Sequence, residues 1–299
     1  MQTFAPHVTQ ANHDLWEYVA CVRADIELAL EECLPLAPDA VGTRFNEALR
    51  WSIFPGGKRL RPVLTLLGAE VVGGRGRNVL SAAAAIEYIH TSSLILDDLP
   101  CMDNALERRG RASVHSRYGE GLAVLVALAL MNTSYGLLFL TDAPERAAIT
   151  AHKEFVECIG TNGMVVGQTV DLAKDGESDA PLQVRNLKTS ALMRMALRTG
   201  AILAGGSDKD LDALSQFAES IGEAYQMRDD VLDAQEDRAL AANSQRTQTI
   251  AMSDGSGGAM RRIHELVADG KESLYTHFGS TATAARLSQM ADYIATRTV

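Results

Sequence analysis

Aspartates gather in two short motifs of this 299-residue sequence. The first, DDLPCMD at 97–103, ends an apolar segment, and the second, QMRDDVLD at 226–233, lies within one. A helix would place positions 226, 229, 230 and 233 on one face, because they are spaced i, i+3, i+4 and i+7. Clustered carboxylates suit Mg²⁺, which shares its coordination shell with phosphate oxygens and water. An Asp-Asp pair is more often a solvated helix end, but the apolar neighbours of both motifs count against that interpretation.

Basic residues that suit an anion occur elsewhere in the chain. The segment GGKRLRP at 56–62 places a glycine turn and two or three cations at the start of a helix, a combination that suits a diphosphate. The other candidates, in chain order, are His90, Arg108, Arg109 and the pair Lys188-Thr189. Each alone is more often a solvated surface charge. Their occurrence together with two metal-binding motifs predicts an anion site.

The elements that position these residues are predicted to be helices. Long Ala- and Leu-rich segments lie between the eight prolines, and no segment alternates like a strand. The expected helices are about 12–33, 40–53, 62–72, 78–98, 105–117, 120–140, 144–171, 182–204, 208–234, 257–270 and 280–298. We therefore predict an all-α fold, with residues 1–299 forming a single large helical bundle. Residues 234–258, which lack amphipathic order, are expected to form a loop or lid, disordered in part.

Composition excludes several classes of protein. The 28 Lys and Arg against 38 Asp and Glu give a net charge of -10, which is unsuited to nonspecific nucleic-acid binding. The four cysteines form no CxxC pair, so we expect reduced thiols in a cytoplasmic protein. The N-terminus has no basic region followed by an apolar core, and we predict no signal peptide.

The segment 121–140 is long and uncharged enough to span a bilayer. Polar residues at 132–135 interrupt it, and no basic cluster flanks it closely. We therefore expect no membrane span, but a central helix buried in a soluble bundle.

At these motifs the sequence resembles the trans-isoprenyl diphosphate synthases (polyprenyl synthetases). GGKRLRP resembles the loop that binds the homoallylic substrate, and the two aspartate motifs resemble the aspartate-rich motifs of the family. GMVVGQTVDL at 163–172 and LKTSAL at 187–192 resemble two further family segments, in the same order. The four-residue spacer of the first motif and its surroundings are most similar to bacterial geranylgeranyl diphosphate synthases.

The resemblance implies the isoprenoid synthase fold, with a deep central cavity and aspartates facing each other across its mouth. It implies three Mg²⁺ ions with the allylic diphosphate bound, held by Asp97, Asp98, Asp103, Asp229, Asp230 and Asp233. By the same resemblance the allylic diphosphate would contact Arg108, Lys188, Thr189 and Gln226. Isopentenyl diphosphate would be held by Lys58, Arg61, His90 and Arg109. The implied reaction is a head-to-tail (1'–4) condensation by a homodimer.

Product length in the family depends on the size of residues at the cavity floor. Ser92 and Ser93, five and four residues before Asp97, are small and favour a C20 product, geranylgeranyl diphosphate. Met131 and Tyr135 are candidates for the floor itself, although ordinary core packing is the more common role of such residues.

The sequence departs from the family pattern after the second motif. No lysine occurs between Lys209 and Lys271, where relatives carry two, and Arg238 or Arg246 is the available substitute. Residues 126–130 read VALAL, where many relatives have Gly-Asp. Three alternatives to a geranylgeranyl synthase therefore stay open: a farnesyl or geranyl diphosphate synthase, a class I terpene cyclase, and a non-catalytic subunit of a heteromeric synthase.

Overall fold

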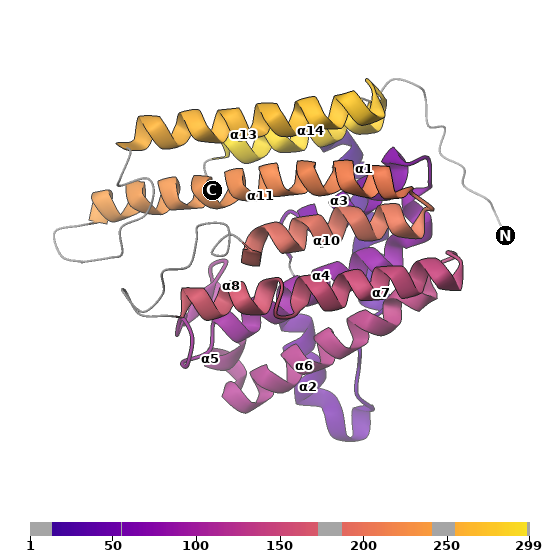
Figure 1. The fold of residues 1–299 in the computed structure, drawn as a ribbon. Coiled ribbons are helices and arrows are strands. Elements are labelled where there is room, and N and C mark those ends of the chain that lie inside the picture. The colour runs from indigo at the N-terminus through magenta and orange to yellow at the C-terminus, as the bar shows by residue number, and fades with distance from the viewer. Residues whose placement is uncertain (1–13, 55, 173–186, 241–254, 298–299) are drawn as a thin grey trace.

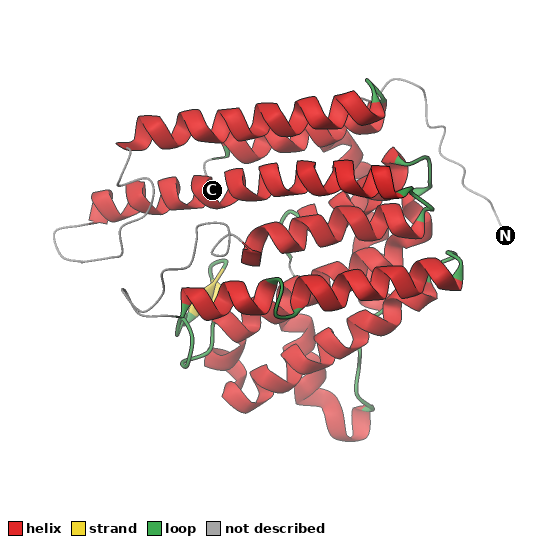
Figure 2. Cartoon of the chain, in the orientation of Figure 1, coloured by secondary structure: helices red, strands yellow, loops and turns green. Residues whose placement is uncertain are grey.

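The computed structural model describes residues 14–54, 56–172, 187–240 and 255–297, and these are almost entirely helical (Figures 1 and 2). Within the helices, the structure describes only the backbone of residues 41, 187–189, 233–240 and 255–256. The predicted all-α fold is confirmed.

The helices are, in chain order, α1 (Leu15–Glu32), α2 (Asp39–Ile53), α3 (Leu60–Val71), α4 (Leu80–Asp97), α5 (Val114–Tyr118), α6 (Glu120–Leu137), α7 (Glu145–Ile159), α8 (Met164–Asp171), α10 (Leu187–Leu203), α11 (Asp208–Leu240), α13 (Gly255–Phe278) and α14 (Ala282–Thr296). Two short 3-10 turns, η1 (Gly76–Val79) and η2 (Leu138–Leu140), adjoin α4 and α6.

Helix α4 lies at the centre of the bundle. It packs against α1, α2, α3, α6 and α10, and most of its residues are buried. Four consecutive alanines, 82–85, let neighbouring helices approach it closely because their side chains are small. Helix α10 lies between α3 and α11, and α13 covers the other side of α11 (Figure 1). The carboxyl end of α4 is thereby directed toward the middle of α11.

Two of the expected helices are wrong. The segment expected as a helix over 105–117 instead forms a two-stranded hairpin, β1 (Glu107–Arg108) and β2 (Arg111–Ala112), before the short α5. Its turn residues Arg109 and Gly110 have φ of 56° and 72°, a backbone conformation that continues no right-handed helix. The helix expected over 144–171 is divided into α7 and α8 by the glycines at 160 and 163.

Helical structure also extends further at the C-terminal end than expected. Helix α11 runs to Leu240, so the first residues of the predicted 234–258 loop are helical, and α13 begins at Gly255. The remainder of that predicted loop, 241–254, lies outside the described residues.

Helix α6 lies at the edge of the bundle rather than at its centre. By length and hydropathy, the stretches 76–97 and 120–140 would each be able to cross a membrane, and 72% and 39% of their most apolar windows are buried. The first contains the core helix α4. The second, which we expected to be buried all round, leaves Leu125, Leu128 and Leu140 more than half exposed. One face of α6 packs on α4, and the exposed Leu125 and Leu128 border a groove that residues of α2 also line.

Candidate active site

A cavity of about 660 Å³ opens where α3, α4, α10, α11 and α14 converge. Its apolar wall comes from these helices and includes Leu64, Leu94, Leu192, Met193 and Met290. Its polar residues are charged for the most part: Lys58, Arg59, Arg61, Glu87, His90, Asp97, Arg108, Arg109, Asp229 and Arg297. Both aspartate motifs therefore contribute to one cavity, and so do the basic loop 56–62, His90 and the pair Arg108-Arg109.

The first aspartate motif ends α4. Asp97 is the last helical residue and Asp98 follows it, and the two are only 6% and 3% exposed. The chain then folds back on the helix end, since the backbone N–H of Asp103 donates to the carbonyl of Asp97 at 2.9 Å. The third aspartate of the motif is thereby held beside the first, although its own side chain is exposed.

The hairpin positions the two arginines that follow the motif. Arg108 donates from Nε to Asp98 Oδ1 at 3.0 Å and from Nη2 to the same oxygen. The Arg109 guanidinium lies close to the 56–62 loop: a Cβ built on Gly57 would stand only 3.1 Å from Arg109 Cζ. Arg108 therefore serves the first motif, whereas Arg109 reaches the basic loop.

The second aspartate motif lies in α11, and its helical spacing is confirmed. Asp229 lines the cavity together with Asp97, and Gln226 donates to Asp230 at 3.4 Å. Asp229 forms an ion pair with Arg297, just beyond the end of α14. The Arg297 guanidinium also lies over the ring of Tyr225, 3.7 Å from its centroid.

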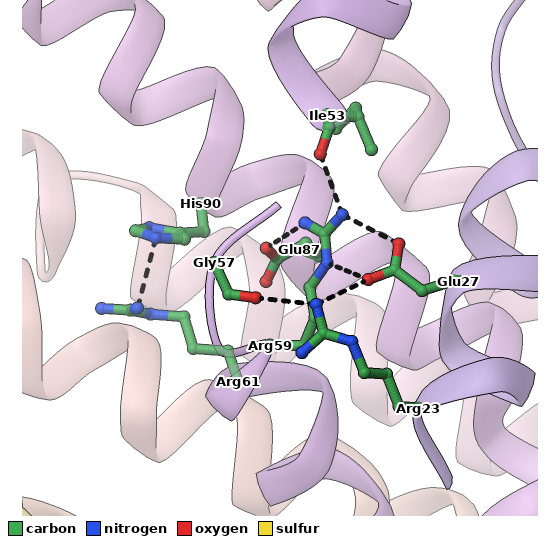
Figure 3. Close-up of polar contacts among 8 residues, drawn as sticks. All are labelled: Arg23, Glu27, Ile53, Gly57, Arg59, Arg61, Glu87 and His90. Atoms are coloured by element: carbon green, nitrogen blue, oxygen red, sulfur yellow. Dashed lines mark hydrogen bonds and ion pairs between the residues drawn. The ribbon is translucent and has the colours of Figure 1, made fainter. Parts of the chain in front are cut away.

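Arg61 and His90 form a basic pocket in the same cavity. Arg61 Nη1 and His90 Nε2 are 3.3 Å apart (Figure 3). Arg61 Nε and His90 Nδ1 are buried and have no hydrogen-bond partner among the described residues. Burial lowers the pKa of both groups, and for His90 the charges of Arg61 and Arg109 lower it further. A buried nitrogen without a hydrogen-bond partner is costly, and the oxygens of an anionic ligand would supply the partners that Arg61 Nε and His90 Nδ1 lack.

Lys58 extends this pocket toward the C-terminus. Its ammonium contacts the Tyr293 hydroxyl of α14 and lies 5.1 Å from the centroid of that ring. The predicted isopentenyl diphosphate residues Lys58, Arg61, His90 and Arg109 are thus all brought together.

The chain-length residues are placed differently from the prediction. Ser93 lines the cavity, but Ser92 is fully buried and donates to the Ala127 carbonyl of α6 at 3.0 Å. Neither Met131 nor Tyr135 is among the described residues of the cavity wall. Tyr135 instead packs on Phe155 of α7, with ring centroids 6.1 Å apart. The helical turn of α4 thus directs one serine to the cavity and the other to α6, and the role of these four residues in chain length stays a prediction.

Some predicted residues fall outside the described part of the chain. The backbones of Lys188, Thr189 and Asp233 lie in helices, but their side chains are not described. The same holds for Arg238, and Arg246 lies outside the described residues altogether.

Sequence reasoning missed the contribution of the C-terminal helix. Tyr293 of α14 and the adjoining Arg297 line the cavity, and no motif identified them. The only available signal was an aromatic residue and an arginine four positions apart near the chain end, a pattern too common to be informative.

The aspartates fit a magnesium site that is completed by the substrate. Their oxygens are hard ligands of the kind Mg²⁺ prefers, and Asp229 already pairs with a positive charge at the cavity. Among the described residues no group of three His, Cys, Asp or Glu side chains is close enough to hold an ion alone. Mg²⁺ commonly takes one or two carboxylates and fills its shell with phosphate oxygens and water, and this arrangement leaves room for them.

An all-α bundle with carboxylates and arginines around one apolar cavity is suited to a molecule that is apolar at one end and anionic at the other. The model of the polyprenyl synthetase family matches residues 43–245, and the chain belongs to this family.

Relatives and solved structures agree with this assignment. A geranylgeranyl diphosphate synthase from Cyanophora paradoxa is 38% identical over 232 residues, covering 75% of this chain and 76% of the relative. A heterodimeric geranylgeranyl pyrophosphate synthase large subunit from Arabidopsis thaliana is 37% identical, covering 72% of this chain and 58% of that protein. The chain spans about three fifths of the length of three Arabidopsis relatives that it matches. The apo crystal structure of an FPP/GFPP synthase from Zymomonas mobilis superposes with a TM-score of 0.82 at 31% identity, covering 94% of this chain and 98% of that one.

Proposed function

We propose that this chain is a trans-prenyl diphosphate synthase that condenses isopentenyl diphosphate head to tail (1'–4) with an allylic diphosphate. One observation carries the proposal: a single cavity contains two separate places for a diphosphate. One is bordered by Asp97 and Asp229, and the other by the buried, partly unpartnered Arg61 and His90.

The first place would bind the allylic diphosphate. Asp97, Asp98 and Asp103 on one side, and Asp229, Asp230 and Asp233 on the other, would hold Mg²⁺, which when bound neutralises charge on the departing diphosphate. Additional contacts to this diphosphate would come from Arg108, Lys188, Thr189 and Gln226. These donors favour cleavage of the allylic C–O bond, with the electron pair leaving on the diphosphate.

The second place would hold isopentenyl diphosphate by its own diphosphate. Arg61, His90, Lys58 and Arg109 would fix the molecule so that its double bond faces the allylic carbon. The double-bond electrons form the new C–C bond, and loss of a proton restores an alkene. The described residues of the cavity wall include no evident general base, so the released diphosphate is the proposed proton acceptor.

The apolar wall protects the reaction from water. Leu64, Leu94 and Leu192 surround the place where the allylic cation forms. Exclusion of water there prevents capture of the cation as an alcohol.

We propose geranylgeranyl diphosphate as the product. The geranylgeranyl synthases among the relatives and the small Ser93 on the cavity wall support this length. The test is incubation with Mg²⁺, isopentenyl diphosphate and each of the dimethylallyl, geranyl and farnesyl diphosphates, followed by mass spectrometry. A C20 product is expected, whereas a C10 or C15 product would contradict the proposed length and keep the chemistry.

The same experiment separates the other functions. A terpene cyclase would release a hydrocarbon from an allylic diphosphate without isopentenyl diphosphate. Such an enzyme binds a single diphosphate and would not need the pocket formed by Arg61 and His90. A non-catalytic subunit would form no product alone. The intact aspartate motifs argue against a non-catalytic subunit. The absence of lysines between 209 and 271 argues for one, so the experiment has to distinguish the two.

We further propose a cytoplasmic, single-domain protein that forms a homodimer through α6. The exposed face of α6 includes Leu125 and Leu128, and no charged residue occurs over 121–140. A second copy would present the same neutral, apolar surface, as a two-fold interface requires. One relative is named as a subunit of a heterodimer, so a different partner is the alternative.

A further inference from the structure

Arg59 is a cation of the basic loop whose guanidinium is bound by other protein groups, although the residue borders the cavity. It stands between Lys58 and Arg61, yet it is only 3% exposed, and its side chain points away from that of Arg61 (Figure 3). Its backbone has φ of 54° and ψ of 34°, the left-handed conformation, which is energetically unfavourable for a residue with a Cβ. Such a backbone persists only where the surroundings hold it.

Three separate helices hold the Arg59 guanidinium. Nη1 donates to Glu87 of α4 at 2.7 Å, and Nη2 donates to the Ile53 carbonyl at the end of α2 at 2.8 Å. Nε and Nη2 each donate to Glu27 of α1 at 3.1 Å. The planar fork thus joins α1, α2 and α4 directly beneath the loop.

The Arg59 guanidinium occupies the space that a side chain at position 56 would need. A Cβ built on Gly56 would lie 1.9 Å from Arg59 Cζ and 2.1 Å from Nη2. The tip of an arginine side chain is ordinarily able to move aside, but here its three partners fix it. An alanine at this position would therefore have to displace the guanidinium from its anchors.

The position of Glu87 connects the anchor to the substrate pocket. Glu87 and His90 are three residues apart on α4, and both line the cavity. The ion pair with Arg59 therefore fixes the loop to the same helix face that presents His90.

We propose that Arg59 is a positioning residue for the homoallylic substrate: anchored to α1, α2 and α4, it holds the loop so that Lys58 and Arg61 converge with His90 on the diphosphate of isopentenyl diphosphate. This inference rests on the proposed function, and it assigns to Arg59 no contact with either substrate.

The test compares the two substrates in steady-state kinetics of the full chain. R59Q and G56A should each raise the KM for isopentenyl diphosphate by about tenfold or more, because a misplaced binding loop loses its orientation. The KM for the allylic diphosphate should stay within about twofold, because the aspartate site is not part of this loop. R59K, which offers one ammonium in place of a fork, should lie between R59Q and the wild type.

A second variant covers loss of folding. R59Q alone leaves the Glu87 carboxylate buried without its partner, so the double variant R59Q/E87Q removes both charges. It should fold and still bind isopentenyl diphosphate weakly, as measured by calorimetry without the allylic substrate. R77Q, which breaks the exposed 3.0 Å pair with Asp25, is the control and should leave both KM values unchanged.

Several outcomes would overturn the assignment. Equal rises in both KM values, a fall in kcat alone, or wild-type affinity for isopentenyl diphosphate in R59Q/E87Q would make Arg59 merely structural. If the wild type performed no condensation, the proposed function would fail, and calorimetry with isopentenyl diphosphate would still decide whether Arg59 positions the loop.

Discussion

At the scale of single residues, burial sets the protonation of two side chains, a histidine in the site and a cysteine away from it. His90 is surrounded by arginines, and its pKa lies well below the usual value because of burial and the nearby Arg61. Cys158 is buried between α7 and α10, where burial and then the charge of Glu154 raise its pKa to about 12. Each shift has a measurable consequence.

For His90 we predict a loss of stability in mild acid. An unfolded histidine takes up a proton below about pH 6.5, whereas folded His90 resists protonation until a lower pH. The unfolded state therefore binds more protons in this window, and stability falls as the pH drops through it. H90Q should lose less of its urea midpoint between pH 7.5 and 5 than the wild type. H264Q, at an exposed histidine, is the control and should lose as much of its urea midpoint as the wild type. A loss in H90Q equal to that of the wild type would contradict the prediction.

For Cys158 we predict resistance to alkylation in the native protein. Its thiol stays protonated at pH 8 and is not accessible, whereas Cys21 and Cys101 are exposed. Iodoacetamide labelling read by peptide mass spectrometry should modify Cys21 and Cys101, and Cys158 only after denaturation. Labelling of native Cys158 as fast as Cys101 would show that the helices around it open readily.

The individual site residues were largely predictable, but their pairings were not. The aspartates and the basic loop stand out by residue type and local spacing. By contrast, Asp229 and Arg297 are 68 positions apart, and only the packing of α11 on α14 brings them together. The serine that faces the cavity, however, was predictable, because Ser93 lies three residues after His90 and four before Asp97 on α4.

At the scale of elements, a buried ion-pair cluster joins α7 to α10. Glu154 is 6% exposed, and it forms ion pairs with Arg198, whose Nε lies 2.9 Å from Oε2, and with Arg194, whose Nε lies 3.8 Å from Oε1. Helix α10 in turn supplies Leu192 and Met193 to the cavity wall. The cluster therefore supports the wall from outside without touching the substrate.

We predict that E154A destabilises the protein by about 3 kcal/mol, because it leaves two partly buried guanidinium groups without their carboxylate. The matched control is E265A, whose pair with Arg262 is exposed and should contribute under about 0.5 kcal/mol. Urea unfolding of the two variants measures the difference. If E154A lost no more stability than E265A, water would have replaced the Glu154 carboxylate as the partner of the two arginines, and the prediction would be wrong.

Helix boundaries were predictable where proline or glycine marked them, and less so elsewhere. The hairpin at 107–112 was missed because its strands are two residues long, too short for an alternating pattern. The length of α11 was underestimated because its last turns carry no amphipathic pattern, although charged and alanine residues favour a helix there.

At the scale of the whole molecule, the apolar face of α6 is the largest departure from expectation. The sequence shows that the helix is apolar all round but not whether protein, lipid or a second copy covers its outer side. We predict that L128E is monomeric, because a charge at the centre of a two-fold interface is repeated in the partner.

Light scattering after gel filtration should show a wild-type dimer and an L128E monomer of unchanged helicity. L28E, at an exposed leucine of α1, is the control and should stay dimeric. A wild-type monomer would contradict the homodimer and direct attention to a different subunit.

The central claim is that the two aspartate motifs act together in one cavity. The most direct test is the initial rate of condensation of isopentenyl diphosphate with farnesyl diphosphate in D97N, D229N and the control D212N. Removal of a metal-binding carboxylate should lower kcat by about 10²-fold or more in each of the first two variants, because charge on the departing diphosphate is no longer neutralised. D212N, on the same helix as Asp229 but outside the cavity, should keep the wild-type rate. Wild-type rates in D97N or D229N would contradict the account.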